Sequence, residues 1–209
     1  MEHDFWHNKW DKNEIGFHEP EGNVLLVKYA NRLLSCPAPR IFVPLCGKTR
    51  DIHWLLSQGC QVVGAELSEL AIQQLFNELD IEPTVTQSGE LLLYSADNIN
   101  IFVGDIFKLT SAQLGQISAV YDRAALVALP EALRKKYAEH LSSLTHKAPM
   151  LIISFSYEQS LMAGPPFSVT RSMIEPLYRD YTISLLEQSP APEKIKGKVD
   201  ADNLVFYIS

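Results

Sequence analysis

Between residues 40 and 69 the chain contains an apolar strand, a turn with one glycine, an amphipathic helix and a second apolar strand, in that order. We predict the first strand over 40–44, the helix over 49–58 and the second strand over 61–65. The second strand leads directly to a carboxylate, Glu66, about 20 residues after Gly47. A strand–turn–helix–strand unit that ends on an acid is typical of one half of a nucleotide-binding α/β unit, in which the acid accepts hydrogen bonds from a ribose.

The rest of the chain extends this pattern into one α/β domain over residues 1–209. Apolar strands alternate with helical segments, which predicts a mainly parallel sheet with two final strands that can pair antiparallel. We predict a hairpin within 91–103, strands over 117–122, 150–155, 181–187 and 203–208, and a long helix over 131–146. The helical segment 1–35 precedes the first strand.

Composition excludes several classes of protein. The formal charge of -7 argues against nucleic acid as a partner. No stretch of about 18 apolar residues is present to cross a membrane, and the N-terminus lacks the basic start and apolar run of a signal peptide. The cysteines Cys36, Cys46 and Cys60 are widely spaced and indicate neither a zinc site nor a disulfide framework. We therefore expect a protein of the reducing cytoplasm.

The turn after the first strand, Leu45-Cys46-Gly47, precedes the N-terminus of a helix. Backbone N–H groups and the positive helix end at such a place favour a carboxylate or a phosphate, and an ordinary tight turn is the alternative. Gly47-Lys48-Thr49 is similar to the end of the phosphate-binding loop of nucleoside triphosphatases. That loop needs a further glycine where this chain has Phe42, so we reject this interpretation.

Polar side chains follow three of the predicted strands. Glu66 is either a ribose-binding acid or only a neighbour of the helix cap Ser68. Asp105 can accept from an adenine amino group or can serve as a turn aspartate. Arg123 lies at the edge where open α/β sheets bind ligands, and it can hold an anionic or electron-rich substrate. The alternative for Arg123 is a structural ion pair with a neighbouring carboxylate.

Aromatic side chains crowd the start of the chain, at Phe5, Trp6, Trp10 and Phe17. They either staple an N-terminal helix to the core or form a lid over a flat ligand, and a sulfonium or an aromatic ring would gain from such a face. His3, His7 and Asp11 share one face of this helix. A surface helix explains them, and we expect no metal site.

Taken together, the sequence motifs of this chain resemble those of the thiopurine S-methyltransferase family, within the class I S-adenosylmethionine-dependent methyltransferases. The likeness covers almost the whole chain, in order. It runs through Phe5 to Trp10, Ile15 to His18, Pro44 to Lys48, Val62 to Glu69, Tyr121 to Ala128 and Gly164 to Phe167. Pro-Leu-Cys-Gly and Gly-Pro-Pro-Phe are particular to this family, whereas general methyltransferases carry a glycine-richer first loop.

The resemblance implies a Rossmann-like α/β sandwich, with a mainly parallel seven-stranded sheet, an antiparallel last strand and an N-terminal helical lid over 1–35. It implies S-adenosyl-L-methionine as the methyl donor and the sulfur of aromatic or heterocyclic thiols, such as thiopurines, as the acceptor. The residues expected to bind the donor are Trp10, Leu45, Glu66, Asp105, Ile106 and Arg123. Phe17 and Arg123 are expected to border the acceptor, with Arg123 as the catalytic residue. We expect a monomer.

Three alternatives stay open on the sequence. The same site could methylate selenium or tellurium compounds, because a soft, polarisable acceptor atom fits the same chemistry. A nicotinamide-dependent oxidoreductase contains the same strand–turn–helix unit, but it needs more glycines in the first turn and a second nucleotide-binding half. A ligand-binding protein without catalysis is the third, because catalysis by positioning leaves few distinctive residues.

Overall fold

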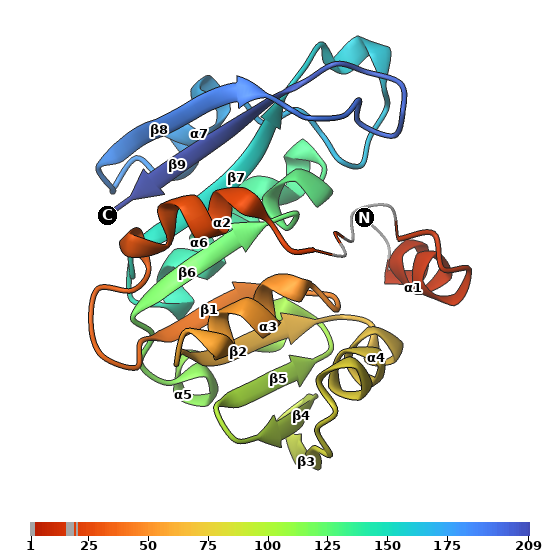
Figure 1. The fold of residues 1–209 in the computed structure, drawn as a ribbon, viewed down its shortest axis with the longest axis vertical. Coiled ribbons are helices and arrows are strands. Elements are labelled where there is room, and N and C mark those ends of the chain that lie inside the picture. Colours follow the sequence, from red (N-terminus) through yellow and green to blue (C-terminus); the bar gives the residue numbers. More distant parts are fainter. Residues whose placement is uncertain (1–2, 16–18, 20) are drawn as a thin grey trace.

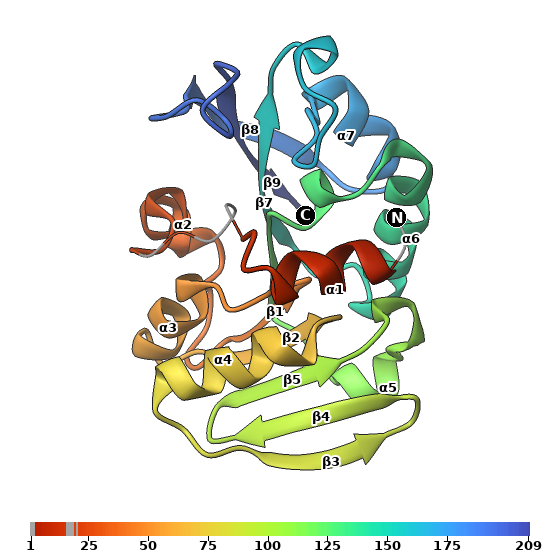
Figure 2. The same cartoon turned by 90° about the vertical axis from the view of Figure 1, so that its right-hand side faces the viewer.

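The computed structural model describes residues 3–15, 19 and 21–209. The described residues form a mixed sheet of nine strands with helices on both faces (Figures 1 and 2). Across the sheet the strands are β3 (Thr84–Ser88), β4 (Leu91–Ala96), β5 (Ile99–Val103), β2 (Gln61–Glu66), β1 (Arg40–Pro44), β6 (Ala119–Arg123), β7 (Met150–Ser156), β9 (Asp202–Ile208) and β8 (Ile183–Pro190). The expected α/β fold is confirmed.

The five central strands are parallel, because β1 pairs with β2 and β6, β2 also pairs with β5, and β6 also pairs with β7. Their side chains are buried on both faces, as the continuous apolar runs predict. In β1, Ile41 and Val43 enter one core cluster and Phe42 enters the other. All five strands therefore end at the same edge of the sheet, which is where the sequence places its candidate site residues.

The expected number of seven strands is wrong, because two antiparallel strands extend one edge. β3 pairs with β4, and β4 pairs with β5, so the predicted hairpin is followed outward by a further strand. The sequence of β3, Thr-Val-Thr-Gln-Ser, has no buried side chain and therefore no apolar alternation to reveal it. At the other edge, β9 pairs antiparallel with β7 and with β8, as predicted for the end of the chain.

The helices divide between the two faces. Helices α2, α3 and α4 lie on one face and α5, α6 and α7 on the other, as Figure 2 shows. Their bounds are α1 His3–Asp11, α2 Val24–Tyr29, α3 Arg50–Ser57, α4 Glu69–Leu79, α5 Ser111–Leu114, α6 Glu131–Leu144 and α7 Arg171–Leu177. The 3₁₀ helices are η1 Ala30–Arg32, η2 Ile106–Lys108, η3 Leu126–Ala128 and η4 Gln159–Leu161.

Helix α1 differs from the other helices in its place. It lies beyond the carboxyl ends of the parallel strands rather than on a face of the sheet (Figures 1 and 2). No described residue before Leu25 belongs to either core cluster. Within the predicted segment 1–35, α2 buries Leu25 and Leu26 in the core, so only the part that precedes α2 is separate from it.

None of the helices in the described part of the chain has the length and apolar character needed to cross a lipid bilayer.

Candidate active site

The order of the strands brings four of the sequence-predicted residues into one row. Asp105 follows β5, Glu66 ends β2, Leu45 follows β1 and Arg123 ends β6, and these strands are consecutive neighbours in the sheet. Neighbouring strands lie about 4.8 Å apart, so Glu66 and Arg123 stand roughly 10 Å apart along this edge. An extended ligand that lies across the strand ends would reach all four.

The turn after β1 folds over the end of β2. The N–H of Cys46 donates to the carbonyl of Ala65 over 3.0 Å, and the N–H of Gly47 donates to the carboxylate of Glu66 over 2.7 Å. Leu45 and Gly47 adopt left-handed backbone angles, with φ of 47° and 51°. Non-glycine residues seldom adopt this conformation, and where they do they are often at ligand sites. The turn therefore holds Leu45 at the sheet edge, next to Glu66.

Glu66 is a buried carboxylate with fixed partners. Only 6% of its surface is exposed, and its two oxygens accept from the N–H groups of Gly47 and of Ser68, the latter over 2.9 Å. Burial raises the pKa of Glu66 above its usual range, and the N–H groups of Ser68, Gly47 and Leu67 oppose this rise. A carboxylate has about four acceptor positions, so this one retains capacity for a hydroxyl donor from a ligand.

Asp105 and Ile106 begin the segment after β5. The carboxylate of Asp105 accepts from the N–H of Phe107 over 3.0 Å and so caps η2. Ile106 is buried, and its carbonyl is 2.8 Å from Nε2 of His140 on α6. The turn-aspartate role considered for Asp105 is therefore present. Asp105 also follows β5, the strand next to the one that ends on Glu66.

Arg123 forms an ion pair with Glu19, and its side chain is only 10% exposed. The structural ion pair that we considered as the alternative role of Arg123 is thus present. Its partner, Glu19, lies in the segment before α2. Sequence reasoning missed Glu19 altogether, because no pattern around it distinguishes it from an exposed glutamate. The pair places a hydrogen-bond donor, the guanidinium of Arg123, beside a hydrogen-bond acceptor, the carboxylate of Glu19, at the end of β6.

Asp122, the neighbour of Arg123, faces the opposite side of the sheet. It is fully buried and accepts from the N–H of Leu126 over 3.0 Å and from the hydroxyl of Tyr137 over 2.7 Å. Burial raises the pKa of Asp122 to about 6, against the effect of these two hydrogen bonds. Asp122 therefore anchors β6 to α6 and so supports the position of Arg123.

We expect this buried acid to make stability depend on pH. Its pKa is 3.8 when unperturbed and about 6 in the folded chain, so between these values the folded chain keeps a proton that the unfolded chain releases. The free energy of unfolding therefore falls as pH rises from about 4 to about 6, by on the order of 3 kcal/mol. Asp122→Asn keeps an acceptor oxygen for the N–H of Leu126, can donate its amide to the hydroxyl oxygen of Tyr137, and loses this dependence on pH. Urea unfolding at several pH values measures the difference, with the exposed Asp97→Asn as the matched control. Parallel curves for wild type and Asp122→Asn would contradict the expectation.

Helix α1 buries one of its two tryptophans. Trp10 is 4% exposed, whereas Trp6 is half-buried and packs edge to face against Phe5 with ring centroids 5.2 Å apart. Trp10 is therefore the more enclosed of the two tryptophans, on a helix that packs against α4. Phe17, the other aromatic residue expected at the site, lies outside the described residues.

The Gly-Pro-Pro-Phe segment connects the loop after β7 to η3, which follows the neighbouring strand β6. The N–H of Phe167 donates to the carbonyl of Val127 over 2.7 Å, and the hydroxyl of Tyr157 donates to the carbonyl of Pro166 over 2.6 Å. Val127 belongs to η3, which follows Arg123 on the same strand–loop segment. This loop therefore restrains the segment that follows Arg123.

Lys48 has a structural partner. Its ammonium group is 2.7 Å from the carboxylate of Glu78 on α4, so it links the β1 turn to that helix. This contact explains the lysine without a triphosphate ligand, in agreement with the missing glycine. Across residues 3–15, 19 and 21–209, no group of three or more His, Cys, Asp or Glu side chains lies together in a way that could hold a metal ion.

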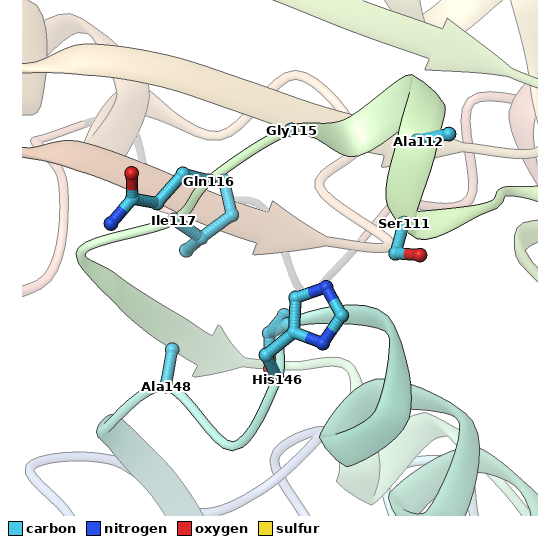
Figure 3. Close-up of a pocket in the computed structure, with 8 residues that line it drawn as sticks. Ser111, Ala112, Gly115, Gln116, Ile117, His146 and Ala148 are labelled. Carbon is cyan, nitrogen blue, oxygen red and sulfur yellow. The ribbon is translucent and has the colours of Figure 1, made fainter.

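A surface hollow with a volume of about 490 Å³ lies elsewhere, at the amino ends of β6 and β7 (Figure 3). Gly115, Gln116 and Ile117 line it just before β6, and His146 and Ala148 line it before β7. None of the sequence-predicted site residues contributes to it. Ligands of open α/β sheets bind at the carboxyl ends of strands, so we do not assign the active site to this hollow.

Comparison with known protein families gives a match over nearly the whole chain. The family model described as thiopurine S-methyltransferase (TPMT) matches residues 1–202. A thiopurine S-methyltransferase of Xanthobacter autotrophicus is 51% identical over 210 residues, which cover 100% of this chain and 99% of the relative. A thiopurine S-methyltransferase of Teredinibacter turnerae is 50% identical and covers 100% of this chain and 98% of the relative.

Solved structures with low sequence identity share the fold. A SAM-dependent methyltransferase from Anabaena variabilis superimposes with a TM-score of 0.64 at 17% identity, over 99% of this chain and 95% of that chain. The magnesium protoporphyrin IX methyltransferase from Synechocystis, crystallised with bound SAH, gives a TM-score of 0.61 at 14% identity, over 99% and 98% of the two chains. At these identities the likeness supports the fold alone.

Proposed function

This chain belongs to the thiopurine S-methyltransferase family, and we propose from that premise that it transfers the methyl group of S-adenosylmethionine to the sulfur of an aromatic or heterocyclic thiol. The observation that carries the proposal is the buried carboxylate of Glu66, held by two backbone N–H groups at the end of β2 within the row from Asp105 to Arg123. That arrangement suits a ribose with an adenine on one side and a reactive group on the other.

The residues at the sheet edge fit an adenosyl donor. Glu66 would accept from the ribose hydroxyls, and Asp105 and Ile106 would flank the adenine one strand further on. Leu45 and the turn after β1 would support the middle of the donor, next to Arg123. Trp10 would cover it from α1. When bound, the donor supplies a methyl group that its sulfonium makes electrophilic.

The residues of this chain contribute mainly by positioning and by excluding water. Arg123 would hold the acceptor sulfur in line with the methyl carbon through its N–H groups. The aromatic helix α1 would close over both molecules and limit the entry of water. Simple aromatic thiols ionise near neutral pH, so these acceptors need no strong base. In the one domain that spans 1–209, the part of the segment 1–35 that precedes α2 would act as the lid, with Phe17 beside the acceptor.

We further infer a monomer of the cytoplasm that acts on small molecules and has no nucleic-acid partner. The formal charge of -7 supports the last point, because a nucleic-acid site requires a basic surface.

Methyl transfer from isotopically labelled S-adenosylmethionine tests the function. We expect labelled S-methyl product from both 6-mercaptopurine and 4-nitrothiophenol, with S-adenosylhomocysteine formed in equal amount. Assays with selenite and tellurite in parallel examine the chalcogen alternative. Labelled product from the oxyanions only would replace the proposed acceptor class, and donor binding without product from any acceptor would contradict catalysis.

A further inference from the structure

We propose that Glu19 is a catalytic residue of this reaction, whose carboxylate accepts the ring N–H proton of a heterocyclic thioamide acceptor while Arg123 holds the acceptor sulfur. This inference rests on the proposed function and extends it to the substrate class. A thiopurine in its neutral thione form is a cyclic thioamide, with a ring N–H beside the carbon that carries the sulfur. Methylation of that sulfur requires the ring nitrogen to lose its proton.

The carboxylate of Glu19 is held from two sides. Besides its ion pair with Arg123, it accepts from the side-chain amide of Asn23, whose Nδ2 lies 3.1 Å and 3.4 Å from the two oxygens. Asn23 is itself fixed, because its side-chain oxygen accepts from the N–H of Leu25 over 3.0 Å and caps α2. Glu19 therefore has a defined position beside Arg123.

Asp51 connects this arrangement to the sheet. It is 1% exposed and accepts from the N–H of Asn23 over 2.7 Å and from the hydroxyl of Tyr121 over 3.0 Å. Tyr121 precedes Arg123 by two positions on β6, so both side chains point to the same face of the sheet. The polar chain thus starts on β6 at Tyr121, passes through Asp51, Asn23 and Glu19, and returns to β6 at Arg123.

The charges of the pair favour a neutral acceptor. The carboxylate of Glu19 offsets the guanidinium charge of Arg123, so the two groups together do not provide a net positive charge for a preformed thiolate. They do place a hydrogen-bond donor, the guanidinium, next to a hydrogen-bond acceptor, the carboxylate. This arrangement matches the S=C–N–H unit of a thioamide. A guanidinium has five N–H groups, so Arg123 can bond to Glu19 and to a sulfur at once. Glu19 is 41% exposed and therefore accessible to a ligand.

The proposed step conserves atoms and charge. The acceptor sulfur forms a bond to the methyl carbon while the bond from that carbon to the sulfonium breaks, and its electron pair stays on the sulfur of S-adenosylhomocysteine. The ring N–H bond breaks, its proton moves to Glu19, and the electron pair left on nitrogen allows the C=N bond of the aromatic product to form. The C=S double bond becomes a single bond at the same time, and its π pair stays on the acceptor sulfur. The carboxylic acid then releases the proton to water. One positive donor, one neutral acceptor and one carboxylate become three neutral groups.

Glu19→Gln tests the proposal when two acceptors are compared in the full chain. We expect kcat with 6-mercaptopurine to fall at least about tenfold, because proton transfer to a positioned side chain is lost. We expect kcat with 4-nitrothiophenol, which has no ring N–H and ionises without help, to change by less than about twofold. Calorimetric titration with 6-mercaptopurine in the presence of S-adenosylhomocysteine should give nearly the wild-type affinity, because the glutamine oxygen still accepts from the N–H.

The exposed Glu21→Gln is the matched control and should leave all three measurements unchanged. Glu19→Asp, which keeps a carboxylate, should retain more activity with 6-mercaptopurine than Glu19→Gln does. An equal loss with both acceptors would assign Glu19 only to the positioning of Arg123 and would overturn the proposal, as would no loss with either. The proposed function fails separately, and this inference with it, if the wild-type protein transfers no label to either acceptor.

Discussion

Removal of residues 1–17 should lower kcat/KM with an aromatic thiol by at least about 1000-fold and leave the sheet folded. Helix α1 lies beyond the carboxyl ends of the parallel strands, where it would cover the donor and the acceptor (Figure 1). Neither core cluster contains a described residue before Leu25, so the sheet and the helices on its two faces do not depend on α1. Circular dichroism, thermal unfolding and steady-state kinetics of the shortened chain measure the outcome.

Two single substitutions refine this experiment. Trp10→Ala should reproduce part of the loss, because this side chain is the buried tryptophan of α1. Trp6→Ala is the matched control on the same helix and should cost much less, because Trp6 is only half-buried. Full activity of the shortened chain would contradict the lid, and an unfolded shortened chain would show that α1 belongs to the core.

Glu66→Gln should weaken S-adenosylmethionine binding at least about tenfold. A charge-assisted hydrogen bond contributes roughly 1.5–3 kcal/mol, and a ribose can form one or two with this carboxylate. The substitution keeps the length of the side chain and removes its charge and one of its two acceptor oxygens. Calorimetric titration with S-adenosylmethionine and with S-adenosylhomocysteine measures both affinities.

The same substitution should change stability little in the absence of donor. Burial raises the pKa of Glu66, so its charge is unfavourable in the folded chain, and a neutral side chain removes this cost. Against this, either the N–H of Gly47 or that of Ser68 loses its acceptor, which costs about 1 kcal/mol. We expect the two effects nearly to cancel in the thermal midpoint. Unchanged donor affinity would remove Glu66 from the ribose role.

Local patterns in the sequence predicted the elements that build the site. The apolar run of β1 and the helix after it follow from periodicity, and Ser68 caps α4 as expected. The place of Glu66 at the end of β2 follows in the same way. Each of these features depends on neighbours a few residues away, which the sequence displays directly.

The partners of the site residues could not be predicted from the sequence, because they depend on the order of strands and on packing between distant segments. Nothing near Glu19 indicates that it pairs with Arg123, and nothing near Asp51 indicates Tyr121. Strand β3 lacked a signal because an exposed edge strand buries no apolar side chain. The sequence by itself determined the α/β plan, the strand ends and the acid at position 66. Only the tertiary structure decided which charges meet, because contacts between distant residues arise after the sheet has brought its strands together.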